Sequence, residues 1–403
     1  MPIAGRLSVR TLAVLACTAL AVAACSSSGK PSGGSSASGS TKGGTYNWGI
    51  NGENSGELAY YGLSLTAGIK AYVDQVNAAG GINGHKISLT VLDNAGEQSE
   101  AATNATQLAT SDNVDAMFGG ILSADCTAAT PFVVRYKIPM ACLSVDQQSP
   151  YVFNLGPANQ TAASPLLAAA KKVTGKSNPK AAFVYINTLT DIALAKSMGP
   201  AAKAAGVDLT TSQELNIAAT DVSSAVTAVV NSHPDVMIIT HTGPGMLMVL
   251  KGIRAAGLNI PVVWLDGTGN LPTLATSTDK NVYPMDVTLV PTPTSTGQAA
   301  KNYVTAISPT ITGTPTTMTL NAGESIPAFA TAELFGAALK KCGYPCSGAQ
   351  LKTALESTQI TLPGLISGNF GYTATNHYPY TSWYLLHQVG STVTVVDSFP
   401  VSG

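Results

Sequence analysis

The stretch between residues 46 and 94 constrains the fold of this chain more than any other part of the sequence. Residues 46–50 predict a short strand, and the polar residues 51–56 predict a loop after it. A helix should follow, because apolar residues recur there at every third or fourth position. These residues are Leu58, Tyr61, Leu65, Ile69, Val73 and Val76. Glycines at 80–84 end the helical pattern, and residues 86–93 alternate like a second strand.

This order of strand, helix and strand indicates an α/β fold. Parallel neighbours in a sheet need a long crossover, and a helix of this length supplies one with the usual right-handed connection. Asn54, followed by Glu57 three positions later, predicts the cap of the helix. In such sheets ligands gather at the carboxyl ends of the strands, so the 51–56 loop lies at the expected binding edge.

The same stretch resembles the opening of the type I periplasmic binding proteins. Within that family it is most similar to the leucine/isoleucine/valine-binding group, which serves ABC importers. The residues that carry the resemblance are Tyr61, Gly62, Gly68, Ala71, the run 77–87 and Asp93. The resemblance implies two doubly wound, Rossmann-like α/β lobes joined by a three-segment hinge, with no cofactor.

Residues 1–24 predict a targeting segment that is not part of the fold. Two arginines give it a positive start, and the fourteen-residue apolar stretch after them is too short for a membrane span. Val22-Ala23-Ala24-Cys25 resembles the bacterial lipobox, which implies that Cys25 is lipidated and anchors the protein to the outer face of the cell membrane. Two alternatives stay open, a lipobox that ends at Cys17 and a plain secretory signal.

Residues 25–44 predict a flexible tether. Fourteen of the nineteen residues after Cys25 are Gly or Ser, the composition of flexible linkers. A linker of this length has a typical span of about 25 Å, since the span grows with the square root of residue number. The sequence thus predicts a folded body tethered to the membrane.

The rest of the chain, about 360 residues, can bury two cores of ordinary domain size. Strand and helix patterns keep alternating along it, which predicts parallel sheets with helices on both faces. The Pro- and Thr-rich run 291–297 is the clearest internal break, and strands at 380–386 and 392–396 predict a final hairpin. The resemblance assigns 45–160 plus 291–365 to the first lobe, and 161–290 plus 366–403 to the second.

The charge of the chain is low and balanced. Without the two arginines of the targeting segment it carries 19 basic and 22 acidic residues, a net charge of −3. This balance does not indicate a nucleic-acid partner. Beyond residue 24 no stretch approaches ~18 consecutive apolar residues, so the body is expected to be soluble, and we expect a monomer.

Four cysteines belong to the predicted body: Cys126, Cys142, Cys342 and Cys346. An even number in an exported chain suggests disulfides. A Cys126–Cys142 bond would tie a helix start to the next strand, and a Cys342–Cys346 bond would follow a helix end. Four cysteines allow three pairings, and the sequence does not choose among them. A metal site is not expected, because no histidine stands near them at ligand spacing.

The resemblance implies a small ligand, an amino acid or related metabolite, held in a cleft between the lobes. A ligand carboxylate needs hydroxyls and free backbone N–H groups at helix starts. Residues 119–125 end a strand and open a helix, and Ser123 matches the hydroxyl residue that binds the carboxylate in the family. The alternative role for Ser123 is that of a plain helix N-cap.

Two more candidates follow the next strand. Ser144 keeps a hydroxyl where the family binds the ligand's carboxylate and ammonium groups. Asp146 stands where the family has threonine, and an acid there repels a carboxylate and attracts an ammonium. The alternative for both residues is a structural role in the turn.

The last three candidates also come from the resemblance. Asp266 matches the acidic residue that pairs with the ligand ammonium, which would offset the cost of burying its carboxylate. Its alternative is an Asx turn. Thr242 lies in a strand-end turn where the family places an aromatic or hydroxyl residue, and Tyr61 matches a tyrosine at the lip of the cleft. The alternative for Tyr61 is a core position. Residues 187–191 lack the aromatic wall found in the family.

These observations predict an extracytoplasmic substrate-binding lipoprotein of an ABC importer, with permease and ATPase subunits as partners. Its mechanism would be closure of the lobes on the ligand. No His-Glu-x-x-His, Gly-x-Ser-x-Gly or Walker sequence occurs, so an enzyme is not expected. The alternatives are a ligand-sensing receptor of the same fold that signals through a membrane partner and, more remotely, an exported hydrolase.

Overall fold

The computed structural model describes residues 44–56, 58–143, 149–216, 219–240, 244–265, 279–291, 295, 297–309, 324–389 and 392–401. The predicted targeting segment and Cys25 lie outside the described residues, as does the tether up to residue 43. Four candidate binding residues also lie outside them: Ser144, Asp146, Thr242 and Asp266.

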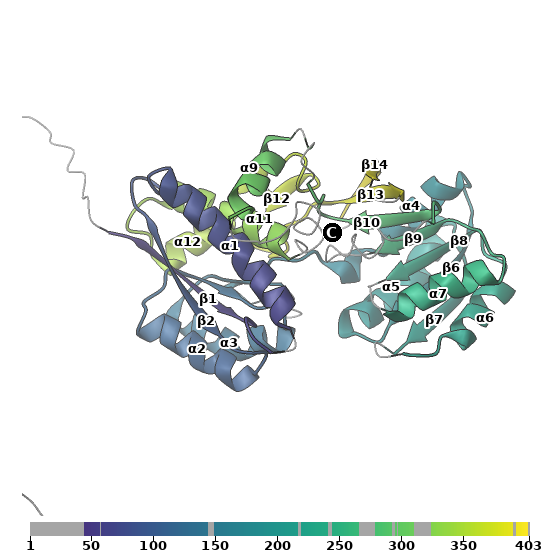
Figure 1. The fold of residues 1–403 in the computed structure, drawn as a ribbon, viewed down its shortest axis with the longest axis horizontal. Helices are drawn as coiled ribbons and strands as arrows, with labels where there is room; N and C mark the ends of the chain where they lie inside the picture. Colours follow the sequence, from purple (N-terminus) through teal and green to yellow (C-terminus); the bar gives the residue numbers. More distant parts are fainter. Residues whose placement is uncertain are drawn as a thin grey trace, which may run out of the picture. The chain divides into compact units, whose positions relative to one another are not determined.

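Five parallel strands form the first sheet, in the order β2-β1-β3-β4-β5 (Figure 1). Its strands are β1 (Tyr46–Gly52), β2 (Ile87–Asp93), β3 (Ala116–Gly119), β4 (Met140–Cys142) and β5 (Val152–Asn154). The helices that follow the first three strands are α1 (Ala59–Ala78), α2 (Gln98–Thr110) and α3 (Ser123–Tyr136). The predicted strand–helix–strand unit is therefore confirmed, with β1 and β2 as parallel neighbours.

Helices cover both faces of this sheet. On one face, Trp48 and Ile50 of β1 belong to a core shared with α1 and α11 (Ser325–Cys342). On the other face, Met117 and Met140 form a separate core with α2 and α3. The helix α11 comes from the last quarter of the chain, so the first lobe is closed by a segment far away in sequence.

Asn54 does not cap α1, so the predicted capping signal is wrong. The helix begins at Ala59, after Leu58 as N-cap residue, and no side chain caps it. The side-chain oxygen of Asn54 instead accepts a hydrogen bond from the Thr66 hydroxyl at 2.8 Å. Its backbone N–H donates to Asp93 Oδ1 at 2.9 Å, so the end of β2 holds the loop in place.

Seven strands form the second sheet, in the order β14-β13-β10-β9-β8-β6-β7. Five are parallel: β6 (Lys180–Ile186), β7 (Asp208–Leu215), β8 (Val236–Thr240), β9 (Val262–Leu265) and β10 (Val282–Asp286). The strands β13 (Ser382–Val389) and β14 (Thr392–Pro400) add an antiparallel hairpin, as predicted. Residues of α4 (Ala163–Thr174) and α5 (Leu189–Ala205) share one core with this sheet, and residues of α6 (Ser223–Asn231) and α7 (Pro244–Ala255) share another.

The chain passes between the two sheets three times: after β5, after β10 and before β13. Between the last two passages lie α9 (Gln298–Ile307), α11, α12 (Gly348–Leu355) and a small sheet of β11 (Gln359–Thr361) and β12 (Asn369–Gly371). The Tyr372 hydroxyl donates to the Asn154 carbonyl of β5 at 2.8 Å. Tyr372 therefore contacts the first sheet, and the lobe boundaries given from the sequence stay a prediction.

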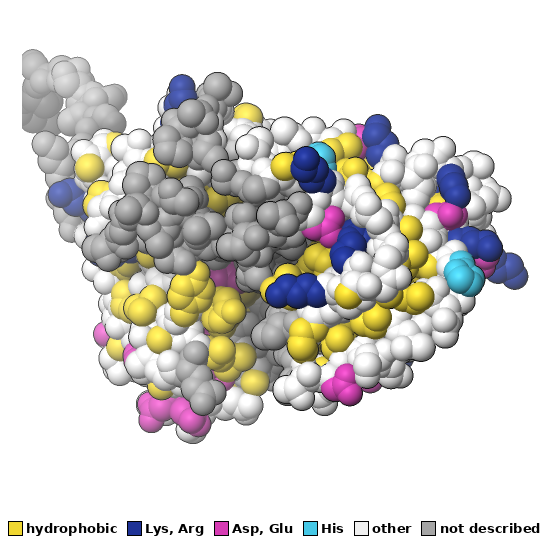
Figure 2. Space-filling model, turned by 45° about the vertical axis from the view of Figure 1, so that its right-hand side comes forward, with side chains coloured by type: hydrophobic (Ala, Val, Ile, Leu, Met, Phe, Trp, Pro, Cys, Tyr) yellow, Lys and Arg dark blue, Asp and Glu magenta, His cyan; other side chains and the backbone are white. Residues whose placement is uncertain are grey.

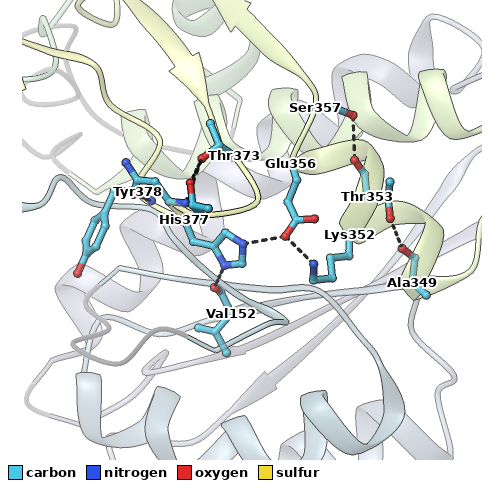
Figure 3. A network of polar contacts seen from close by, with 11 residues as sticks. Val152, Ala349, Lys352, Thr353, Glu356, Ser357, Thr373, His377 and Tyr378 are labelled. Carbon is cyan, nitrogen blue, oxygen red and sulfur yellow. Dashed lines mark hydrogen bonds and ion pairs between the residues drawn. The ribbon is translucent and has the colours of Figure 1, made fainter. Parts of the chain in front are cut away.

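A buried network holds the segment after β12 against β5 and α12 (Figure 3). The His377 ring contacts the Val152 carbonyl oxygen through Nδ1 at 2.8 Å and Glu356 Oε1 through Nε2 at 3.1 Å. Lys352 Nζ donates to the same Glu356 oxygen at 2.5 Å. Burial alone would raise the pKa of Glu356, but the hydrogen bonds from Lys352 and His377 outweigh it and lower the pKa. The network therefore fixes the chain before it returns to the second sheet.

Two disulfides join the four cysteines of the body. Cys126 pairs with Cys142, which ties the first turn of α3 to the end of β4. Cys342 pairs with Cys346, which bridges the end of α11 and the residue before the N-cap of α12. These are the two bonds that the helix and strand positions suggested from sequence.

One face of the surface can be followed for its charge, and the described helices for their hydrophobicity. On the face drawn in Figure 2, Lys and Arg side chains are spread in small groups and do not form one continuous band. Within the described ranges, no helix combines the length and the hydrophobicity that a membrane span requires.

Candidate binding site at the strand ends of the first sheet

A polar network at the carboxyl ends of β1 and β2 fixes the loop that leads into α1. The buried Asn51 side chain donates to the Ala101 carbonyl at 2.7 Å, and the buried Asn94 side chain contacts Asn51 Oδ1 at 3.3 Å. Asp93 Oδ1 accepts the backbone N–H groups of Asn54 at 2.9 Å and Ala95 at 2.9 Å. Desolvation by burial would raise the pKa of Asp93, but these hydrogen bonds outweigh it and lower the pKa.

Glu53 extends from this loop to the start of α3. Its side chain is fully buried, with Oε2 accepting the N–H of Ile121 at 3.0 Å and Oε1 accepting the N–H of Leu122 at 3.2 Å. Unpaired N–H groups and the helix dipole make a helix start a binding site for anions. The Glu53 carboxylate therefore binds the two backbone N–H groups that directly precede the first residue of α3. A Cβ atom at Gly120 would lie 2.0 Å from Glu53 Oε2, so this approach requires glycine at that position.

Asp125 places a second carboxyl group at the same helix start. Its side chain is 2% exposed, and among the described residues its carboxyl group has the Glu53 carboxyl as hydrogen-bond partner. Burial raises the pKa of Asp125 to about 6, and the charge of Glu53, a side-chain hydrogen bond with Glu53 and the charge of Glu97 raise it further. The two acids repel each other unless a proton is shared between them.

Asp125→Asn should stabilise the protein above pH 6 and have little effect near pH 4. The pKa of Asp125 is higher in the folded than in the unfolded chain. The Asp125 carboxyl group therefore makes its full favourable contribution to the free energy of unfolding below the unfolded pKa. That contribution is lost as the pH rises from about 4 to about 6. Urea unfolding at pH 7.5 should show a gain of about 1–3 kcal/mol for the variant.

The control for this experiment is Asp208→Asn, which removes an exposed carboxyl at the first residue of β7. The difference in stability between wild type and Asp208→Asn should not change with pH to a comparable extent. A stability difference between wild type and Asp125→Asn that stays constant from pH 4 to pH 7.5 would contradict the raised pKa of Asp125.

The two predicted binding residues that the structure describes lie on different helices. Ser123 is the first residue of α3 and is partly exposed, whereas the N-cap residue is Leu122, so the N-cap alternative is wrong. Tyr61 lies near the start of α1, is 38% exposed and contacts Tyr60 edge-on at 5.2 Å, which excludes the alternative core role. The ligand contacts of Ser123 and Tyr61 stay predictions.

Sequence reasoning missed two buried acids at strand ends. Glu53 follows β1 directly, and an acid one residue beyond an apolar strand is a signal that could have identified it. Asp286 ends β10, is 1% exposed, and accepts hydrogen bonds from the Thr288 N–H at 2.9 Å and hydroxyl at 3.0 Å. Because Met285 pairs with Leu265, Asp286 lies beside the end of β9, which Asp266 follows in sequence.

The described residues do not suggest metal chemistry. Among them, no three His, Cys, Asp or Glu side chains are arranged to hold a metal ion.

Comparison with known proteins agrees with this architecture. A family model described as periplasmic binding protein matches residues 45–392. The Leu/Ile/Val-binding protein homolog 7 of Brucella melitensis is 25% identical over 324 residues, which cover 76% of this chain and 79% of that protein. An amino acid binding protein of Pseudomonas aeruginosa is 34% identical over 82 residues, or 20% of this chain and 22% of that protein.

Solved structures share the fold over most of the chain. The leucine-, isoleucine-, valine-, threonine- and alanine-binding protein of Brucella ovis, in a closed conformation, has a TM-score of 0.74 at 18% identity, covering 89% of this chain and 96% of its own. A branched-chain amino acid transporter substrate-binding protein of Streptococcus pneumoniae, in complex with isoleucine, has a TM-score of 0.66 at 22% identity. The match covers 89% of this chain and 99% of that protein. Since the family model spans most of the residues and the two sheets match these structures, the chain belongs to the periplasmic binding protein family and has the two-lobed α/β fold of its type I members.

Proposed function

We propose that this protein is the substrate-binding component of an ABC importer and captures an amino acid or a related small polar metabolite outside the cytoplasm. The observation that carries this proposal is the family match over residues 45–392. The relatives support it, because their names describe binding of leucine, isoleucine and valine, and one solved neighbour holds isoleucine. Permease and ATPase subunits are the partners that such a component requires.

The fold suits capture by closure. Two α/β lobes linked by three chain passages can rotate about those passages, and a ligand that contacts both lobes favours the closed form. In sheets of this type the binding residues come from the carboxyl ends of the strands. In the first lobe that edge carries Glu53, Ser123 and Asp125. In the second lobe it carries Asp286, with Asp266 next to it in our proposal.

The N-terminal region completes the proposal. Cys25, after the lipobox-like run 22–25, would carry the lipid, and the Gly- and Ser-rich residues that follow would let the body reach a permease in the same membrane. Labelling of the protein with a radioactive fatty acid should depend on Cys25. Labelling that persists in Cys25→Ala would move the anchor elsewhere, with Cys17 as the next candidate.

A ligand panel tests the importer function. Thermal unfolding of the protein, followed by calorimetry, should be measured with amino acids, their amides, simple amines and aromatic acids. One chemical class should stabilise the protein, by about 2.7 kcal/mol when the ligand is at 100 times its Kd. No ligand should be consumed. If no small polar solute stabilises the protein, the proposed function fails.

Asp266→Asn should weaken a ligand that carries an ammonium group by about 2 kcal/mol or more, because the substitution removes one partner of a buried charge pair. Calorimetry with the best ligand of the panel measures the change. Asp208→Asn, the same substitution at an exposed position, is the matched control. Equal affinity of wild type and Asp266→Asn would reject the ammonium contact and leave the fold assignment intact.

A further inference from the structure

We propose that the loop of residues 342–346, which the Cys342–Cys346 disulfide closes, is a clamp that holds the start of β1 where the predicted tether joins the folded body. The clamp prevents β1 from fraying at its first residues. The tether itself rests on the function proposed above, whereas the contacts of the clamp involve described residues alone and need neither ligand nor lipid.

Aromatic rings and hydrogen bonds connect the start of β1 to this loop. The Tyr344 ring stacks on the His85 ring, with 3.9 Å between their centroids, and meets the Tyr46 ring edge-on at 5.2 Å. His85 Nδ1 donates to the Gly44 carbonyl at 2.9 Å, because a carbonyl oxygen only accepts. The Tyr46 hydroxyl donates to the Gly343 carbonyl at 3.0 Å, across 297 positions of the chain. The first described residues are therefore bound from two sides.

The fit at Gly44 leaves no room for a side chain. A Cβ atom there would lie 1.7 Å from the Tyr344 hydroxyl oxygen. The Tyr344 ring has little freedom to move aside, because His85 covers one of its faces and Tyr46 packs against it. Flexibility alone would allow serine as well as glycine at the last position of the predicted tether, whereas this contact requires glycine.

The clamp is itself supported by its surroundings. The disulfide joins Cys342, the last residue of α11, to the buried Cys346, and a loop closed in this way samples fewer conformations when it is free. The Asn83 side chain donates to the Lys340 carbonyl of α11 at 3.2 Å. The turn of residues 82–85 therefore holds the His85 ring beside the loop.

The position of β1 in the sheet explains why its start needs a clamp. Chain ends fray unless other contacts tie them down, and a tether would pull on this end. β1 lies between β2 and β3, and its Trp48 and Ile50 are fully buried in the core. The N–H of Tyr46, which donates to the Lys86 carbonyl at 3.0 Å, would be the first bond of β1 to open. Fraying beyond it would expose the core of the first lobe.

Hydrogen exchange of single amides, measured by NMR on the intact chain, tests the clamp. Tyr344→Ala should speed the exchange of the Tyr46 amide by at least about tenfold, because it removes both ring contacts of the loop. The amide of Phe118 in β3 should change by no more than about twofold, since the core stays closed. Tyr136→Ala, which removes another exposed tyrosine at the last residue of α3, should leave both rates unchanged.

Two further variants reach the same contacts from the other partners. Gly44→Ala should also speed exchange at Tyr46, whereas Gly199→Ala, in α5 with open space around it, should not. Replacing Cys342 and Cys346 together by alanine should speed it as well. In that background Tyr344→Ala should add less than about threefold, because both changes open the same clamp.

Unchanged exchange at Tyr46 in Tyr344→Ala and in Gly44→Ala overturns the clamp. Equal acceleration at Tyr46 and Phe118 also overturns it, because the whole lobe would then be destabilised. If Tyr344→Ala does not fold, Gly44→Ala decides, since it deletes no contacting atom. None of these measurements involves a ligand, so failure of the clamp leaves the importer function standing, and failure of the ligand panel leaves the clamp standing.

Discussion

Replacing Phe335 with alanine is expected to lower the free energy of unfolding by about 3–5 kcal/mol, the largest effect of any single substitution considered for this protein. Phe335 is fully buried in α11. Its ring lies 5.0 Å from that of Phe118, 6.3 Å from that of Phe153 and 6.4 Å from that of Trp48. The substitution would leave a cavity where α11 meets three strands of the first sheet, and the fixed backbone around it cannot collapse fully.

Urea unfolding followed by circular dichroism measures this loss. Lys340→Ala, at an exposed position of the same helix, should change the stability by no more than about 0.5 kcal/mol. A loss below about 1 kcal/mol for Phe335→Ala would mean that α11 does not close the core of the first lobe.

The double substitution of Cys126 and Cys142 by alanine should cost about 3 kcal/mol, from the loop that the disulfide closes in the unfolded chain. The bond spans 16 positions, and both cysteines are almost fully buried. It joins α3 to β4, so its loss should also loosen the helix start that Glu53 contacts. Thermal unfolding under oxidising conditions measures the effect.

The Cys342–Cys346 bond supplies the matched comparison. It spans only four positions, and its loss should cost about 2 kcal/mol in the same chain-entropy model. If the shorter loop proves to be worth more than the longer one, loop entropy is not the main source of stability, and local packing around the sulfurs must be.

The turn before α3 shows how a contact distant in sequence adds to a sequence-based prediction. From the sequence, the turn at 119–125 looked ready to bind a ligand carboxylate through Ser123 and free N–H groups. In the structure the N–H groups of Ile121 and Leu122 bind Glu53, and Asp125 lies beside it. The turn therefore carries two buried acids beside the candidate residue Ser123, which the sequence pattern did not reveal.

Local sequence patterns predicted most helices and strands, because apolar residues repeat with a different period in each. The α1 face repeats every three or four residues, and β2 alternates, so both could be read without their neighbours. The strand β10 was missed, because Pro284 lies in its middle and breaks the usual pattern of a strand. The cap at Asn54 was wrong because Asp93, distant in sequence, binds the same loop.

The sequence by itself determined the order of most strands and helices, the terminal hairpin and the cysteine positions that permit two disulfides. Only the tertiary structure decided that Glu53 binds the N–H groups just before α3, that Asp125 is buried beside it and that Phe335 completes the first core. The physical reason is the strand order. Because β1 pairs with both β2 and β3, the loop after β1 meets the helix after β3, and no local period encodes a contact between residues 68 positions apart.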